Sequence, residues 1–189
     1  MSIQRAMAAL LGVMIFATVV HAADSYKVDP VHSTALFRIQ HAGAGFLYGR
    51  INGPEGTINV DEADPTKTAF DVTLQVKNVD TNNAQRDTHL KSPTFFSAEE
   101  FPTLTFKSTA VKAAGDNKLE VTGNITIHGQ TKPLTVTLDH TGTSDTPQMG
   151  HRIGYEGTFT IKRSDFGMNA MQGAVGDEVR ITISLEGVK

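Results

Sequence analysis

STALFRIQH, residues 33–41, carries the pattern that decides the fold. Ala35, Phe37, Ile39 and His41 fall on one side of this stretch, and mostly polar residues occupy the positions between them. A period of two is typical of a strand that buries one face. The stretch therefore predicts a strand whose apolar side faces the interior of the protein.

The same period recurs along the chain and predicts eight strands. Beyond the first strand, we expect a glycine-interrupted strand over 48–60 and others over 70–76, 104–106, 119–127, 134–138, 153–161 and 179–185. Turn-forming clusters at 114–117 and 128–130 predict antiparallel hairpins. Because closure of a sheet removes its exposed edges, the sequence predicts an all-β protein with an eight-stranded antiparallel barrel.

One section, between residues 80 and 102, breaks this period. Residues 82–90 do not alternate, open with asparagines that can cap a helix and precede Pro93, so they predict a short helical insertion between strands. A second short turn is expected over 97–101. The insertion carries Phe95, Phe96 and Phe101, which need a buried environment. We expect it to cap one end of the barrel.

The first 22 residues have the features of a secretory signal. Arg5 precedes an apolar stretch over 6–20, and small residues around Ala22 fit a signal-peptidase site. The sequence therefore predicts a signal peptide over 1–22, a single domain over 23–189 and a periplasmic or secreted location. An uncleaved N-terminal anchor is the alternative interpretation of the same stretch.

Composition narrows the classes of function. The formal net charge of −3 becomes −4 without Arg5, which argues against nucleic acid as a partner. The chain has no cysteine, which excludes thiol catalysis and thiolate metal sites. It also has no His-Glu-x-x-His and no Gly-x-Ser-x-Gly motif. We therefore predict no metal site and no catalytic residues.

Three polar residues are candidates for binding a ligand head group. Arg86 and His89 lie three apart, on one face of the predicted helix, where a cation and an imidazole are able to hold a polar or phosphorylated group. An ion pair between Arg86 and Asp87 is the structural alternative. His41, near the inward end of the first strand, is a third candidate with a similar alternative.

Several spaced motifs resemble those of the YceI-like family. They are HSxxxFxIxHxG over 32–43, RDxHLxS over 86–92, FPxxxF over 101–106, GxITIxGxTKP over 123–133 and RSDFGM over 163–168. The resemblance covers about residues 24–188. It implies a lipocalin-like barrel with a long apolar interior that binds polyisoprenoid chains or other long lipids, and no established enzyme activity. Ala42 is smaller than the residue that many relatives carry after the histidine of the first strand.

These observations lead to a hypothesis for function. We expect the protein to carry or store a long apolar lipid, isoprenoid or quinone-like, without catalysis and without a required cofactor. Transient contact with a membrane surface or membrane protein is expected, as a monomer or homodimer. The tunnel is expected to be lined by Phe37, Ile39, Phe70, Val72, Leu74, Phe106, Ile125, Ile127, Phe159, Ile161, Ile181 and Ile183, and closed by Phe95, Phe96 and Phe166.

Three alternatives stay open. A broad scavenger of hydrophobic small molecules during envelope stress would use the same tunnel. A hydrolase with an unrecognised site would need a nucleophile and a base that converge in a cleft. A purely adhesive module would have a packed interior with no ligand.

Overall fold

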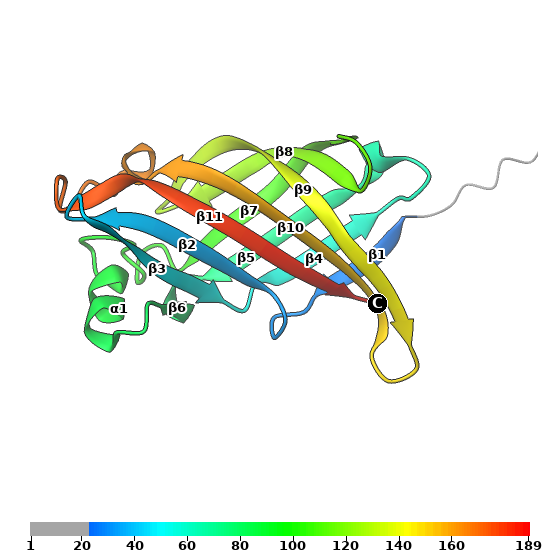
Figure 1. Cartoon of the computed structure of the whole chain (residues 1–189), viewed down its shortest axis with the longest axis horizontal. Helices are drawn as coiled ribbons and strands as arrows, with labels where there is room; N and C mark the ends of the chain where they lie inside the picture. Colours follow the sequence, from blue (N-terminus) through cyan, green and yellow to red (C-terminus); the bar gives the residue numbers. More distant parts are fainter. Residues whose placement is uncertain (1–22) are drawn as a thin grey trace, which may run out of the picture.

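The computed structural model describes residues 23–189, which form a closed antiparallel β-barrel with one short helix (Figure 1). The ring of hydrogen-bonded strands runs through β1 (Asp24–Val28), β4 (Glu55–Val60), β5 (Ala69–Gln75), β7 (Thr103–Ala113), β8 (Lys118–Ile127), β9 (Gln130–Thr146), β10 (Gly150–Lys162) and β11 (Val175–Val188). β11 then pairs with β1 and closes the ring. The signal peptide predicted over 1–22 lies outside the described residues.

Three of the eight strand positions are each built from two segments. The first position is shared by β1 and β2 (Thr34–His41). The C-terminal end of β11 pairs with β1, and the rest of β11 pairs with β2. β3 (Gly45–Asn52) is separated from β4 by residues 53–54, and β6 (Val79–Asp80) follows β5 after a 3-10 turn, Val76–Asn78. The predicted eight-stranded barrel is confirmed. The short β1 lies outside the strand ranges that the sequence predicted.

The insertion between β6 and β7 folds as predicted. Helix α1 covers Ala84–Lys91, and the Asn83 side chain caps it by accepting a hydrogen bond from the Arg86 N–H at 2.9 Å. The turn expected over 97–101 is closed by the Phe101 N–H, which donates to the Ser97 carbonyl at 2.8 Å. Within residues 23–189, no helix is long and apolar enough to span a membrane.

α1 lies where the sheet itself is incomplete. Among the described strands, β6 pairs with β3 and with no second neighbour, and the ladder between β5 and β7 begins at Gln75 and Thr103. The ring is therefore open between β6 and β7 at this end, which also holds the β2–β3 turn (Figure 1). The helix and the loop after it occupy the opening, and we call this the α1 end of the barrel.

The interior holds two clusters of buried apolar side chains. The first contains Tyr26, Ile58, Phe70 and Val121, and the second, toward the α1 end, contains Ile127 and Phe166 among others. Leu74, Phe106 and Phe159 are only partly buried and pack against both clusters. Partial burial of apolar residues inside a barrel indicates that the space between the two clusters is not filled by side chains.

Candidate functional site: two adjoining cavities

A deep apolar cavity lies inside the barrel. Its volume is about 140 Å³, and 21 of its 22 lining residues are apolar, Thr105 being the exception. Twelve of the residues predicted to line a tunnel border it, namely Phe37, Phe70, Val72, Leu74, Phe96, Phe106, Ile125, Ile127, Phe159, Ile161, Ile181 and Ile183. Phe96 comes from the loop after α1, and the other eleven come from β2, β5, β7, β8, β10 and β11. In these strands, alternation turns every second side chain inward.

A second cavity, of about 240 Å³, lies against α1. Ile39 and Phe95, also predicted tunnel residues, line it. Phe37, Phe96, Met168 and Val179 line both cavities, so these four side chains form the boundary between them. The two spaces therefore adjoin and run from the middle of the barrel to its α1 end.

The polar lining of the two cavities is concentrated in the second one. His41, Arg86 and His89, the three head-group candidates, all line it, and so do Gln40 and Arg163, which the sequence did not single out. No carboxylate is among the described residues that line it. The polar end of the site thus contains two guanidinium groups and two imidazoles, and those with free donors suit an electron-rich or anionic group.

Arg86 also has a structural role, by a route that differs from the predicted ion pair. Its Nε donates to Thr81 Oγ1 at 2.7 Å and its Nη2 to the Thr81 carbonyl at 2.6 Å. Asp87 accepts from the Thr81 N–H at 2.9 Å, so the two charged residues share Thr81 as a partner. Nη1 of Arg86 makes no hydrogen bond with any described residue, which leaves a donor for a ligand.

Arg163 has no free donor of this kind. Its side chain is buried, and Nε, Nη1 and Nη2 donate to the carbonyls of Gly176, Met168 and Val175 at 2.9, 2.6 and 3.1 Å. These bonds hold the segment between β10 and β11 beside the second cavity. Arg163 is therefore a positioning residue. The RSDFGM motif was the sequence signal that contained it.

Phe166 lies elsewhere than the other predicted tunnel residues. It is 2% exposed, belongs to the second core cluster and is absent from the lining of either cavity in the described structure. Nδ1 of His128 lies 3.0 Å from the Phe166 carbonyl oxygen, a hydrogen bond that ties the β8–β9 turn to the segment after β10. Phe166 therefore packs in the core next to the residues that line the cavities. Met168, two residues later, faces both cavities.

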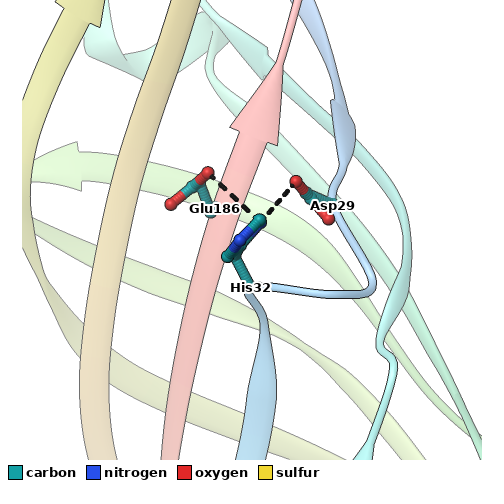
Figure 2. A group of neighbouring side chains, drawn as sticks. All are labelled: Asp29, His32 and Glu186. Carbon is teal, nitrogen blue, oxygen red and sulfur yellow. Dashed lines mark hydrogen bonds and ion pairs between the residues drawn. The ribbon is translucent and has the colours of Figure 1, made fainter. Parts of the chain in front are cut away.

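A charged cluster lies near the C-terminal end of β11, away from α1. Nδ1 of His32 is 2.8 Å from Asp29 Oδ2 and 3.9 Å from Glu186 Oε1 (Figure 2). Nη1 of Arg152 donates to the same two carboxylate oxygens, to Asp29 at 3.0 Å and to Glu186. The hydrogen bond with His32, followed by those from Val31 and Arg152, lowers the pKa of Asp29 well below its usual range.

This cluster connects the loop between β1 and β2 to strands β10 and β11. The groups have the ligand types of a metal site, but the Arg152 guanidinium already occupies the point where the two carboxylates meet and forms an ion pair with each. The sequence did not connect the cluster because more than 150 residues separate His32 from Glu186. For the hydrolase alternative, no serine hydroxyl is hydrogen-bonded to an imidazole nitrogen among residues 23–189.

Comparison with known proteins identifies the family. A model described as the YceI-like domain matches residues 26–187. A Pseudomonas aeruginosa "UPF0312 protein" is 40% identical over 190 residues, 99% of each chain. A Salmonella arizonae "Protein YceI" is 41% identical over 181 residues, 95% of this chain and 94% of its own.

Solved structures share the fold. Burkholderia cenocepacia BcnA matches with a TM-score of 0.76 at 24% identity, over 84% of this chain and 98% of BcnA. A polyisoprenoid binding domain from Saccharophagus degradans, implicated in plant cell wall breakdown, matches with a TM-score of 0.67 at 14% identity, over 86% of this chain and 97% of that domain. With the family model spanning both cavities and relatives alike over almost their whole length, this chain belongs to the YceI-like family.

Proposed function

We propose that the protein binds a long, apolar, isoprenoid-type lipid, with its hydrocarbon chain in the deep cavity and its head group in the second cavity. The observation that carries this proposal is the difference in lining: the deep cavity is apolar, and the basic side chains are confined to the second cavity at the α1 end. The polyisoprenoid binding domain of Saccharophagus degradans has the same fold, which supports this class of ligand. Because the sequence predicts a secretory signal over 1–22, the proposed carriage would take place in the periplasm or outside the cell.

The size of the cavities fits a chain of moderate length. A buried site needs roughly 10–15 Å³ of such volume for each water-sized group. The deep cavity of 140 Å³ therefore has room for about ten such groups and the second, of 240 Å³, for about twenty. A flexible chain of roughly thirty carbon and oxygen atoms would occupy both, which corresponds to a few isoprene units and a head group.

Apolar burial supplies enough free energy for binding without a strong polar contact. At about 25 cal/mol per Å², burial of on the order of 400 Å² of hydrocarbon contributes roughly 10 kcal/mol before the cost of ordering the chain. The polar end then selects among lipids. Nη1 of Arg86 and the His41 and His89 rings favour head groups that accept hydrogen bonds, such as a quinone carbonyl or a phosphate, over amines.

The test measures uptake of a defined isoprenoid alcohol, geranylgeraniol, by delipidated protein with native mass spectrometry. Val179→Phe adds a ring at the boundary between the two cavities and should weaken uptake severalfold. Val31→Phe, the same substitution at a loop residue that is 81% exposed, is the matched control and should bind as the unchanged protein does.

The outcomes separate the alternatives. If the delipidated protein takes up no long-chain lipid, the proposal is wrong and a packed, adhesive module is favoured. If unrelated compact hydrophobes bind as tightly as geranylgeraniol and lose affinity equally in Val179→Phe, a broad scavenger is favoured. Selective uptake of the long chain, lost only in the cavity variant, supports lipid carriage or storage.

A further inference from the structure

The outer face of the neighbouring strands β2 and β11 carries a pair of opposed arginines. Arg38 on β2 and Arg180 on β11 are direct cross-strand partners, and both side chains point outward because their neighbours Phe37, Ile39, Val179 and Ile181 line the cavities. Like charges directly opposite one another destabilise a sheet. The fold tolerates this repulsion.

Neither arginine is neutralised by a carboxylate. Within residues 23–189, Arg38 and Arg180 form no ion pair, while Arg50 on the same face is paired with Asp80 at 2.9 Å. The buried Nε of Arg38 has no hydrogen-bond partner, although its guanidinium lies over the Phe46 ring, 4.1 Å from the centroid. Two cationic groups with unused donors therefore stand side by side on one surface.

Exposed apolar side chains surround these two charges. Phe46 and Tyr48 on β3 and Leu36 on β2 are 52%, 66% and 46% exposed. Tyr48 is the cross-strand partner of Arg38, and Leu36 lies two residues before it on the same face. We call this set, Leu36, Arg38, Phe46, Tyr48 and Arg180, the outer β2–β3 face.

We propose that the outer β2–β3 face docks on the surface of an anionic phospholipid membrane. Paired guanidinium groups bind phosphate oxygens well, and each basic residue near an anionic surface favours binding. Aromatic side chains are enriched at the boundary between headgroups and hydrocarbon, and a small soluble anion would not require them. A second copy of the chain is a poorer occupant, because a symmetric contact would bring two further arginines against the first two.

The outer β2–β3 face lies next to the second cavity. The same hairpin lines the second cavity from inside with Ile39, His41 and Leu47. Met171, which also lines the second cavity, is 50% exposed. A protein held on a membrane through the outer β2–β3 face would keep the α1 end of its cavities close to the lipids. Docking itself requires no guest in the cavities, so its test is independent of the proposed lipid carriage.

The experiment is vesicle co-sedimentation. The chain is used without residues 1–22, whose apolar stretch would bind vesicles by itself; residues 23–189 retain every described strand and both core clusters. Vesicles contain phosphatidylcholine with or without phosphatidylglycerol. We expect binding to the anionic vesicles that weakens as salt is raised, and little binding to phosphatidylcholine alone.

The decisive variant is Arg180→Glu. It removes the repulsion and places an acid opposite Arg38, so the thermal midpoint should stay the same or rise. Binding to anionic vesicles should nevertheless fall about 30-fold, since each unit of charge near such a surface changes binding about fivefold. The control Lys107→Gln/Lys112→Gln changes net charge equally on β7 and should bind as before. Phe46→Ser/Tyr48→Ser should also weaken binding.

Three results would overturn the proposal. The first is no binding to anionic vesicles, and the second is equal loss in Arg180→Glu and the β7 control, which would indicate a general charge effect. The third is a dimer in analytical ultracentrifugation that Phe46→Ser/Tyr48→Ser dissociates while no variant affects vesicle binding; this would assign the face to a second copy.

Discussion

Gly49→Ala offers a test of how the cavity wall is built. Gly49 is the cross-strand partner of Phe37, and its lack of a side chain lets the Phe37 ring lie directly over the β3 backbone. A Cβ at this position would lie 2.8 Å from Phe37 Cε1 and 2.8 Å from Thr81 Cγ2, closer than ordinary van der Waals contact. Thr81 is buried and held by Arg86 and Asp87, so the Phe37 ring has to move.

The Phe37 ring lines both cavities, so free space lies beside it there. Overpacking costs typically about 1–3 kcal/mol, and free space beside the ring places this variant near the lower end. The alanine also lowers the entropy of the unfolded chain by an equivalent of about 0.4–1 kcal/mol, which offsets part of the cost. We expect a net loss of about 1 kcal/mol and a fall in thermal midpoint of about 2–4 °C.

Ligand uptake should be more sensitive than stability. Each methylene group that no longer fits the deep cavity forfeits about 0.8 kcal/mol, which is about fourfold in affinity. Binding of geranylgeraniol should therefore weaken at least about fourfold by native mass spectrometry. Phe37→Leu combined with Gly49→Ala should restore part of this loss, because the smaller side chain leaves room for the new methyl group.

Gly45→Ala is the matched control on the same strand, because a Cβ there meets no atom within 4 Å. It should leave uptake unchanged and should not lower stability, because the alanine adds only the unfolded-state entropy gain of about 0.4–1 kcal/mol. If Gly49→Ala lowers the thermal midpoint as expected but leaves uptake of the long-chain alcohol unchanged, Phe37 does not form the wall of an occupied cavity. The reasoning that joins β3 packing to ligand capacity would then be wrong.

Two further predictions concern charged groups. Arg86→Ala should weaken binding of geranylgeranyl pyrophosphate more than that of geranylgeraniol in parallel titrations; equal effects would show that Arg86 acts only through Thr81. Asp29→Asn should lower the thermal midpoint at neutral pH but have little effect in strong acid. The pKa of Asp29 is below its ordinary value of 3.8, so its interactions stabilise the folded state above that pH and are lost as the pH falls further. A difference in thermal midpoint that persists unchanged in acid would show that the Asp29 carboxylate does not stabilise the fold in this way.

Local patterns predicted the wall of the barrel well. Alternation of the kind seen over 33–41 identifies which side chains face inward, and a two-residue turn such as His128-Gly129, with both residues at positive φ, identifies a hairpin. The capped segment that became α1 was also visible, because Asn83 and Pro93 mark its limits. These features depend on interactions between residues close in the sequence.

What the sequence did not reveal depends on contacts between distant residues. The cluster of Asp29, His32, Arg152 and Glu186 forms only when the β1–β2 loop meets β10 and β11 in the closed barrel. The role of Phe166 was misplaced because the 3-10 turn after β10 rotates it into the core and turns Met168 toward the cavities. The opposed arginines required the register of β2 against β11, which no local pattern contains.

Helix α1 has a consequence for how a guest exchanges. None of its eight residues is fully buried, and a helix of this length is marginal by itself in water. Lifting it disrupts no strand ladder, since β6 and β7 are not joined there. Opening at α1 breaks the hydrogen bonds that join Arg86 and Asp87 to Thr81 but leaves the strand ladders intact. For the proposed lipid binding, α1 is therefore the segment through which a guest would enter and leave the barrel.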